Sequence, residues 1–215
     1  MIRINVFVEG QTEETFVRDV LAPYFVPQEI YLNPILVLTS PGHKGGIVNY
    51  DKVRYQVVKL CQHDRTAYLT TLIDYYGLPN NFPAYDELTL APASERVLRL
   101  EEAFSDDVNE ENFIANFLLH EFEALLFCDP QKFEDWIDDP EPVDTLQNIK
   151  DSFATPEDIN NSRETAPSKR ILSAVPHYRK TLHGPLIAGD IGIDEMRRQC
   201  PHFNYWVEKI VRLNE

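Results

Sequence analysis

Three apolar segments of this chain each end in an acidic side chain. The three junctions are Val8-Glu9, Ile73-Asp74 and Leu119-His120-Glu121. A carboxylate that directly follows a buried strand loses hydration, which is costly unless a partner compensates for it. In open α/β sheets, ligands gather at the edge formed by the carboxyl ends of the strands. We therefore expect these acids to meet at one sheet edge, where they could share a cation.

Apolar segments alternate with amphipathic ones in the first part of the chain. Strands are expected at 2–8, 30–38, 66–73 and 113–119, and helices at 11–24, 50–62, 93–104 and 121–127. This alternation predicts a mostly parallel α/β sheet of about four strands with right-handed crossovers. Beyond residue 130, prolines separate several short helical segments. We predict an α/β core over 1–129 and a helical extension over 130–215, packed on the core as one structural unit.

The composition limits the class of protein. With 215 residues, 43% of them apolar, the chain can close one sizeable core. No segment approaches the roughly 20 apolar residues of a membrane-spanning helix, so we expect no membrane association. Its three cysteines lie far apart in the sequence, which argues against a disulfide framework and favours the cytoplasm.

The net charge of −15 is unevenly distributed. Residues 101–112 and 134–144 are acidic tracts without a base, whereas 163–184 is locally basic. Attraction of the whole molecule to nucleic acid is therefore weak. The basic segment can still hold a nucleic acid or nucleotide locally, and its Lys169 and Arg170 are candidate phosphate-binding residues.

Glu9 lies where the first strand turns into the first helix. Glu13 and Glu14 would complement the dipole of that helix, and Thr12 could cap it. This structural explanation does not cover Glu9, because Glu9 directly follows the buried strand. Gly10 beside it permits close approach of a ligand to the backbone. We therefore assign Glu9 a functional role.

Asp74 gives the stronger signal. The sequence Asp74-Tyr75-Tyr76-Gly77 is also typical of a turn, but the apolar run before it places Asp74 at the functional edge of the sheet. Tyr75 and Tyr76 either stack against a ligand or cover the end of the core.

The third junction carries two acids, Glu121 and Glu123. On a helix these two positions point to different sides, so only one of them easily faces the sheet edge. Glu121 is favoured because it comes first after the strand, with Glu123 close behind. His120 could be a metal ligand, an acid/base group or a structural side chain.

Two further motifs are weaker. The loop Gly42-His43-Lys44-Gly45-Gly46 lacks the spacing of a P-loop, yet its amides, His43 and Lys44 could receive phosphate. A simple connector explains the loop equally well. Cys61-Gln62-His63 and Cys200-Pro201-His202 do not match the usual spacing of structural zinc sites.

The ordered motifs together resemble a known family. They are Val8-Glu9-Gly10-x-Thr-Glu, Ile73-Asp74-Tyr75-Tyr76-Gly77 and His120-Glu121-Phe122-Glu123-Ala124-Leu125-Leu126, followed by Pro167-Ser168-Lys169-Arg170-Ile171, Ile191-Gly192 and Cys200-Pro201-His202-Phe203. The chain resembles, over nearly its whole length, a bacterial family of unknown function that is related to Toprim domains and is sometimes labelled RloG-like.

Toprim domains occur in topoisomerases, primases and nucleases of the overcoming-lysogenization-defect type. They pair a Glu after the first strand with an Asp-x-Asp after the third. Glu9 matches the Glu and Asp74 matches the first Asp, whereas Tyr76 occupies the position of the second Asp. The resemblance therefore implies a Mg²⁺ or Mn²⁺ site with one carboxylate missing, unless Glu121 or Glu123 replaces it.

Phosphodiester cleavage by a metal-dependent nuclease follows as the first functional hypothesis. Asp74 and Glu121 would hold the ion, and Glu9 would act as a further ligand or as a general acid/base. Lys44, Lys169 or Arg170 would neutralise charge on the phosphate. The alternatives are a non-catalytic protein that binds nucleotide or metal, and an interaction subunit that docks on an ATPase partner in a phage-defence pair.

Overall fold

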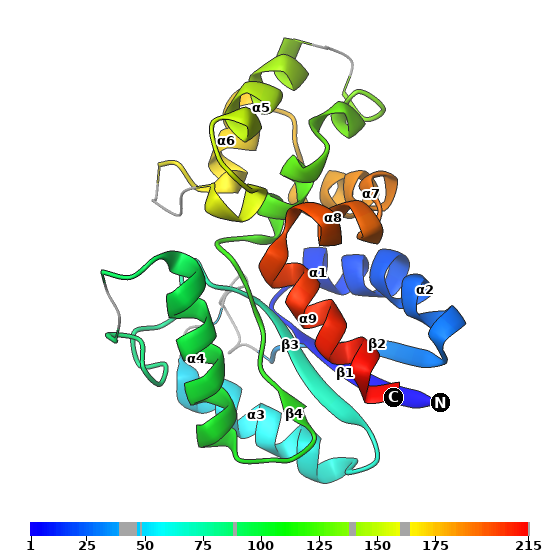
Figure 1. Ribbon diagram of the computed structural model, residues 1–215, viewed down its shortest axis with the longest axis vertical. Helices are drawn as coiled ribbons and strands as arrows, with labels where there is room; N and C mark the ends of the chain where they lie inside the picture. The colour runs from blue at the N-terminus through cyan, green and yellow to red at the C-terminus, as the bar shows by residue number, and fades with distance from the viewer. Residues whose placement is uncertain (39–46, 48, 88–89, 138–140, 160–163, 215) are drawn as a thin grey trace.

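The protein folds around a mostly parallel sheet, in agreement with the predicted α/β class. The structure is a computed structural model that describes residues 1–38, 47, 49–87, 90–137, 141–159 and 164–214. The sheet has the strand order β2-β1-β3-β4, and a short β5 also pairs with β3 (Figure 1). The strands are β1 Ile2–Val8, β2 Ile30–Leu36, β3 Tyr68–Asp74, β4 Phe113–Ile114 and β5 Phe117–Leu118.

The register aligns the carboxyl ends of the two central strands. Val8 lies opposite Leu72 in the parallel pair β1 and β3. Glu9 therefore follows β1 one residue beyond this pair, and Asp74 is the last residue of β3. This alignment is what the pattern of apolar segments ending in acids predicted, and it brings the two acids to the same edge.

Each face of the sheet builds its own core, because successive side chains of a strand point to opposite faces. Ile4, Val6 and Val8 of β1 join the core that contains α1, α2 and α9, whereas Phe7 joins the core beneath α3 and α4. In Figure 1, α1, α2 and α9 lie on one side of the strands, and α3 and α4 lie on the other. The helices on these faces are α1 Gln11–Phe16, α2 Ala22–Phe25, α3 Tyr50–His63, α4 Ala93–Val108 and α9 Pro201–Val211.

The first predicted helix is not uniform. Between α1 and α2 the chain forms a π-helical segment, η1 Val17–Leu21. A single 3₁₀ turn, η2 Val26–Gln28, follows α2. Thr12 does not cap α1, since the N-cap position is Gly10 and no side chain caps the helix. The predicted helix over 121–127 is a 3₁₀ segment, η3 Phe122–Cys128.

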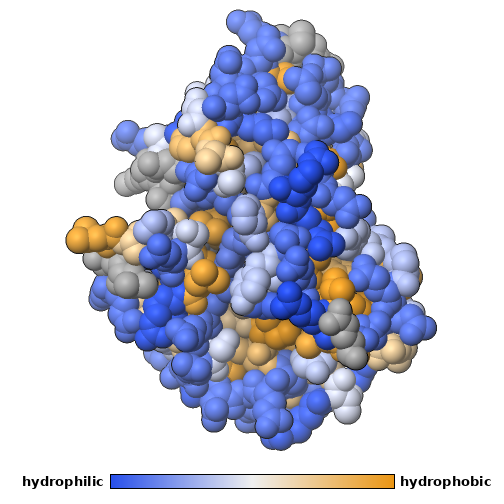
Figure 2. Space-filling view, viewed as in Figure 1, coloured by the Kyte–Doolittle hydropathy of each residue, from blue (hydrophilic) through white to orange (hydrophobic). Residues whose placement is uncertain are grey.

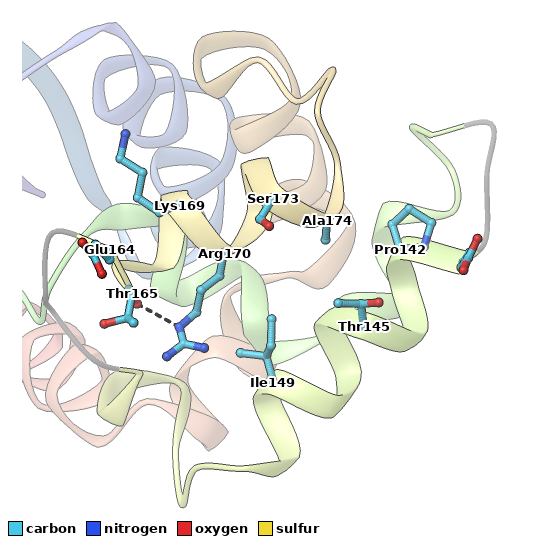
Figure 3. A pocket seen from close by; sticks show the side chains of 10 residues that line it. Pro142, Thr145, Ile149, Glu164, Thr165, Lys169, Arg170, Ser173 and Ala174 are labelled. Atoms are coloured by element: carbon cyan, nitrogen blue, oxygen red, sulfur yellow. Dashed lines mark hydrogen bonds between the residues drawn. The ribbon is translucent and has the colours of Figure 1, made fainter.

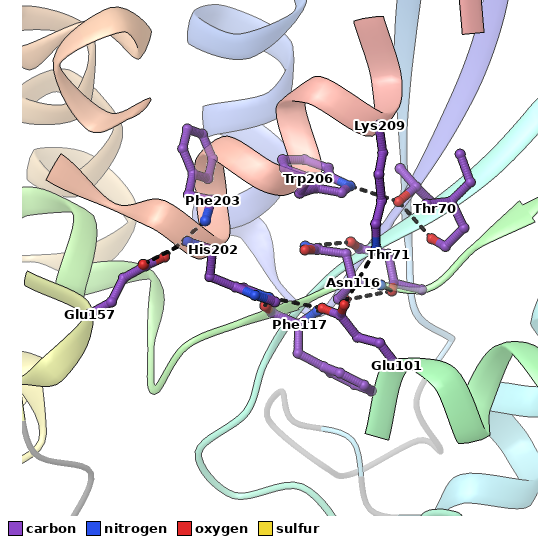
Figure 4. Close-up of polar contacts among 11 residues, drawn as sticks. Thr70, Thr71, Glu101, Asn116, Phe117, Glu157, His202, Phe203, Trp206 and Lys209 are labelled. Atoms are coloured by element: carbon purple, nitrogen blue, oxygen red, sulfur yellow. Dashed lines mark hydrogen bonds and ion pairs between the residues drawn. The ribbon is translucent and has the colours of Figure 1, made fainter. Parts of the chain in front are cut away.

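The predicted fourth strand is split at its centre, which corrects the expectation of one strand over 113–119. β4 and β5 both pair with β3, but Ala115 and Asn116 lie between them. Thr71 Oγ1 donates a hydrogen bond to the Asn116 carbonyl at 2.6 Å and accepts one from its N–H at 2.9 Å (Figure 4). A threonine hydroxyl thus replaces a main-chain partner here, so the regular ladder is interrupted.

One part of the helical extension lies away from the sheet, and another part packs along it. α5 Glu141–Asp151 and α6 Pro167–Ala174 stand at the far end of the molecule from the strands, whereas α9 returns along the sheet (Figure 1). Asn214 Nδ2 donates to the carbonyl of Gln28 at 2.8 Å, which ties the end of the chain to the N-terminal half. The remaining elements are η4 Pro130–Phe133, η5 Pro156–Asp158, α7 Lys180–Ile191, α8 Ile193–Gln199 and η6 Arg212–Asn214.

A buried polar network joins α4 and α9 (Figure 4). The Glu101 carboxylate accepts from the N–H of Phe117 at 3.0 Å, lies 2.9 Å from His202 Nε2 and has Lys209 Nζ at 3.6 Å. Burial lowers the pKa of His202, but the hydrogen bond and charge of Glu101 outweigh it, so the net shift is upward. Glu101 belongs to an acidic tract in the sequence, yet it serves as an internal partner and not as surface charge.

The indole of Trp206 belongs to the same layer, and its loss should be measurable. Trp206 Nε1 donates to Thr70 Oγ1 at 2.9 Å, and Thr70 in turn donates to the carbonyl of Ile114. We expect Trp206→Phe to lower the free energy of unfolding by about 2 kcal/mol, from one lost hydrogen bond and a small cavity. Trp136→Phe is the matched control, because the Trp136 hydrogen bond to Asp190 is exposed. Equal losses in urea unfolding of both variants would contradict the buried assignment.

The surface carries no single dominant hydrophobic patch in the view of Figure 2, where hydrophobic side chains appear in small separate groups on a hydrophilic face. Within the described part of the chain, no helix has both the length and the apolar character required to cross a membrane.

Candidate functional site: a carboxylate cluster at the sheet edge

Acidic side chains from separate elements lie within electrostatic range of one another at the carboxyl edge of β1 and β3. Asp74 ends β3, and the negative charges of all the other members act on it to raise its pKa. The members, called the carboxylate cluster below, are Glu9, Glu13, Asp74, Glu121 and Glu123.

Asp74 is held by the backbone of the neighbouring segment. Its Oδ1 accepts a hydrogen bond from the N–H of Phe122 at 2.9 Å, at the start of η3. Burial first, and then repulsion from the other acids, raise its pKa well above the ordinary value of an aspartate. The free Oδ2 side of this carboxylate has no hydrogen bond within the described part of the structure. Asp74 is therefore the centre of the cluster.

Glu121 and Glu123 both belong to the site, because Glu121 precedes η3 in an extended conformation (φ −144°, ψ 159°) and Glu123 lies in the first turn of η3. Glu121 is buried, and both its oxygens are bound by Ser168, through the N–H at 2.9 Å and the hydroxyl at 3.1 Å. Ser168 is the second residue of α6, so the extension fixes the orientation of Glu121.

Glu123 is 1% exposed and carries the one ion pair that the cluster makes within the described residues. Its Oε1 lies 3.1 Å from Lys180 Nζ, at the start of α7. That oxygen has no well-aligned hydrogen bond within the described residues, and neither does the nearby hydroxyl of Tyr178. Burial raises the pKa of Glu123 to about 7, and the Lys180 charge opposes the shift without cancelling it.

Lys180 remains a cation in this setting. Burial lowers its pKa, but Glu123, Glu121 and Asp74 raise it further than burial lowers it. Its side chain is 43% exposed, so the ammonium lies between the cluster and solvent. Lys180 thus faces several carboxylates.

Glu9 and Glu13 complete the cluster at the turn into α1. Glu9 Oε1 accepts from the N–H of Ile47 at 3.3 Å. Burial raises the pKa of Glu9 and that of Glu13, and the two carboxylates repel each other. A Cβ atom at Gly10 would lie 3.0 Å from Glu13 Oε2, so Gly10 leaves the space that the Glu13 side chain fills. We expected Glu13 only to complement the helix dipole, but it is also a buried member of the carboxylate cluster.

His120 and the two tyrosines lie beside the cluster. His120 adopts a left-handed backbone conformation (φ 68°), and burial lowers its pKa to about 4, so its ring is neutral. Tyr75 contacts both the Arg96 guanidinium, 5.3 Å from its ring centroid, and His120, with ring centroids 6.5 Å apart. The N–H of Tyr76 donates to the His120 carbonyl at 2.7 Å. Tyr75 thus covers the end of the core.

Two of the predicted phosphate-binding residues, Lys169 and Arg170, line a cavity apart from the cluster. Arg170 Nε donates to the carbonyl of Thr165 at 2.8 Å, and Lys169 points away from Arg170 (Figure 3). Both line a cavity of about 470 Å³ between α5 and α6. His43 and Lys44 lie outside the described residues.

A divalent cation fits the cluster by chemistry. Carboxylate oxygens are the ligands that Mg²⁺ and Mn²⁺ prefer, and the Oε1 atom of Glu123 is an incompletely satisfied buried acceptor. However, within the described residues no three His, Cys, Asp or Glu side chains are arranged to hold a metal. The possible zinc ligand Cys200 packs against Cys128, with 3.4 Å between their sulfurs.

Sequence reasoning missed Glu13, Ser168, Tyr178 and Lys180 as parts of the site. Ser168 and Lys180 both lie in the basic segment 163–184, and Ser168 also lies in the motif Pro167-Ser168-Lys169-Arg170-Ile171, but neither signal points to contact with the acids. Their contact with the cluster depends on how the extension folds back over the sheet edge.

Two solved structures are similar in fold. The C-terminal region of the Burkholderia pseudomallei OLD protein matches with a TM-score of 0.50 and 16% identity, covering 100% of both chains. The C-terminal region of the Xanthomonas campestris pv. campestris OLD protein matches with a TM-score of 0.36 and 14% identity over 97% of both chains, which is too weak to support an argument. No curated protein shows significant sequence similarity.

The first of these matches supports the α/β architecture that the Toprim resemblance implied, at the level of the fold. A family model described as Domain of unknown function (DUF4276) matches residues 8–211, which include every member of the carboxylate cluster. The family model does not confirm the RloG-like label. The chain belongs to the DUF4276 family.

Proposed function

We propose that this protein is a metal-dependent phosphodiesterase that cuts nucleic acid at the carboxylate cluster. The observation that carries the proposal is the set of acids around Asp74, which face Lys180. Burial, and then repulsion from the other acids, raise the pKa of Asp74 well above its ordinary value, and burial also raises the pKa of Glu9, Glu13 and Glu123. Such a set is unfavourable by itself and becomes favourable when a divalent cation binds.

The side chains divide into distinct roles under this proposal. Asp74, Glu9 and Glu123 would hold Mg²⁺ or Mn²⁺, with Glu121 oriented by Ser168 as a further ligand. A bound ion of this kind would polarise a phosphoryl oxygen and activate water. Lys180 would neutralise charge that develops on the phosphate, in place of the predicted Lys44.

Metal binding without catalysis is the second candidate. The observations that favour it are Tyr76 at the position of the second Toprim aspartate and the lack of a ready three-ligand group in the described structure. Under either function, a role in phage defence beside an ATPase partner remains part of the proposal. It is supported by the exposed acids of the tract that begins on α4, such as Glu102 and Asp106, which can steer a basic partner.

Metal binding should be visible as stabilisation. At a Mn²⁺ concentration of about 100 times its Kd, the free energy of unfolding should rise by about 2.7 kcal/mol. For a chain of this size, that corresponds to roughly 5–10 °C in the melting temperature. Calorimetric titration with Mn²⁺ and Mg²⁺, beside cleavage assays on single-stranded DNA, duplex DNA and RNA, provides the test.

The outcomes separate the two candidates. Binding with metal-dependent cleavage supports the nuclease, binding without cleavage of any substrate favours the non-catalytic protein, and no binding contradicts both. Assays at low salt are essential, because the net charge of −15 opposes association with nucleic acid.

A further inference from the structure

The cavity between α5 and α6 contains an arginine that is already held in one orientation. The cavity measures about 470 Å³, within the usual range of ligand-binding pockets, and Arg170 lines it. Arg170 Nε donates to the carbonyl of Thr165 at 2.8 Å, and the guanidinium carbon lies 5.4 Å from the centroid of the Phe153 ring. Figure 3 shows the guanidinium directed from α6 toward α5, beside Ile149. These contacts orient the guanidinium without a ligand.

The two terminal nitrogens of Arg170 are available to a ligand. Within the described residues, Nη1 and Nη2 make no hydrogen bond or ion pair, and neither is among the fully buried atoms without a partner. The side chain is half-buried, so these two nitrogens reach solvent. By contrast, Arg54 and Arg99 are paired with acids. A charged, oriented fork of N–H donors without an acid partner matches the oxygens of a phosphate group.

Charged side chains at the rim of the cavity modify this site in both directions. Glu141 and Glu164 also line the cavity, but both are exposed, and neither forms an ion pair with Arg170 in the described structure. Their repulsion of an anion is therefore weakened by water and salt. Lys169 lines the same cavity and adds positive charge, although it points away from Arg170 (Figure 3). Arg170 is thus the contact residue of the site.

Helix α6 connects this cavity with the carboxylate cluster. Ser168 binds Glu121, and Arg170 follows Ser168 by two positions. Residues two positions apart on a helix point to different sides. A helix with its side chains is about 10–12 Å across. A phosphate at Arg170 would therefore lie across α6 from a phosphate at the cluster, so the two sites cannot hold the same group.

We propose that Arg170 binds a second phosphate of the substrate, away from the phosphate that is cut at the carboxylate cluster. This inference rests on the proposed function and narrows its substrate, because two well-separated phosphates belong to a nucleic acid strand and not to a nucleoside monophosphate. The basic segment 163–184 then contacts the substrate at two points, through Arg170 in the cavity and Lys180 at the cluster. A free phosphate or pyrophosphate ion is the competing ligand of the same chemistry.

The salt dependence of binding measures the proposed contact. A short single-stranded DNA with a fluorescent label is titrated with the full chain in EDTA, so that neither metal nor cleavage contributes. Each phosphate contact to a single strand adds about 0.7 to the slope of log K against log salt. Arg170→Ala should therefore lower the slope by about 0.7 and weaken binding at low salt by about tenfold. Arg170→Lys keeps the charge but not the fork, so it should keep the slope and still bind more weakly than the unsubstituted protein.

Arg65→Ala is the matched control, because Arg65 is exposed and lines a different cavity, beside the start of β3. It should leave the slope unchanged. Urea unfolding verifies that each variant is folded, and the lysine variant covers the case in which alanine disturbs the packing on Phe153. Equal slopes for Arg170→Ala and Arg65→Ala overturn the proposal, as does an unsubstituted protein that does not bind the DNA.

A second readout identifies the source of the phosphate. The Nε–H signal of Arg170 in ¹H–¹⁵N spectra reports on the cavity, and its loss in Arg170→Lys assigns it. The DNA should shift this signal in a saturable way. A shift with inorganic pyrophosphate but not with the DNA means that the cavity holds a free anion, which overturns the substrate contact. Because all these measurements are made in EDTA, failure of the nuclease assay and failure of the Arg170 site are distinguishable.

Discussion

Asp74→Asn should reduce metal-dependent cleavage by more than about 100-fold while leaving the fold intact. Loss of a group that only supports a metal ligand typically costs 10–100-fold, and Asp74 is proposed as a direct ligand. Its carboxylate is the member of the cluster on which all the other acids act. Asparagine keeps the shape and retains an oxygen for the hydrogen bond from the N–H of Phe122. It removes the negative charge on which the divalent cation depends.

The same substitution should stabilise the metal-free protein. The pKa of Asp74 is raised in the folded state, so ionisation of this group opposes folding at neutral pH. Stability and activity are therefore expected to change in opposite directions, which a merely misfolded variant cannot reproduce. Asp86→Asn is the control, because Asp86 is exposed and lies outside the cluster.

Urea unfolding in EDTA and cleavage in Mn²⁺, measured on the same preparations, provide the comparison. Cleavage that survives Asp74→Asn would remove the cluster from the mechanism. A stability loss of several kcal/mol would instead show that Asp74 is a structural anion whose charge the fold requires.

The sequence was sufficient to predict the sheet and two of its terminal acids. Apolar runs with abrupt ends define β1 and β3, and the parallel register then places Glu9 and Asp74 at one edge. The break between β4 and β5 was not visible, because it depends on the hydroxyl of Thr71, 45 residues away from Asn116. Local pattern carries no information about such a contact.

The other half of the site could not be predicted for a related reason. Ser168 meets Glu121 across 47 positions of the chain, and Lys180 meets Glu123 only because α7 packs beside α1 and η3. Helix periodicity also separated Glu121 from Glu123, but Glu121 lies before η3 in an extended conformation, so the helical rule does not apply to this pair. The division of the chain at residue 129 stays a prediction. One apolar core nevertheless contains Ile4 from the first strand and Trp206 from the last helix.

Glu123→Gln should raise the stability of the metal-free protein by up to about 3 kcal/mol at pH 8. Glu123 is 1% exposed, and its pKa rises from 4.5 to about 7 on folding. One pKa unit corresponds to about 1.4 kcal/mol, so the shift corresponds to about 3 kcal/mol. Glutamine has nearly the same shape and cannot ionise. Lys180 loses its ion pair but is 43% exposed and remains hydrated.

The sign of the pH dependence follows from the same shift. Below pH 4.5 the carboxyl group is protonated in both the folded and the unfolded state and contributes nothing. Between pH 4.5 and about 7 the unfolded chain releases the proton while the folded protein keeps it, so stability falls as pH rises. Above about pH 7 the full penalty is present. Urea unfolding at pH 5 and pH 8 in EDTA should therefore show the largest gain for Glu123→Gln at pH 8.

Glu111→Gln serves as the control, because Glu111 is exposed and its substitution should change stability by less than about 0.5 kcal/mol at either pH. If Glu123→Gln is instead destabilising at pH 8, the ion pair with Lys180 outweighs the burial of the charge, and Glu123 is a structural anion already satisfied without metal. A different outcome is that Glu123→Gln is more stable than the unsubstituted protein without metal and less stable than it when Mn²⁺ is added. The carboxylate that destabilises the empty protein is then the one that the cation requires. That reversal links the strain of the cluster to its proposed use.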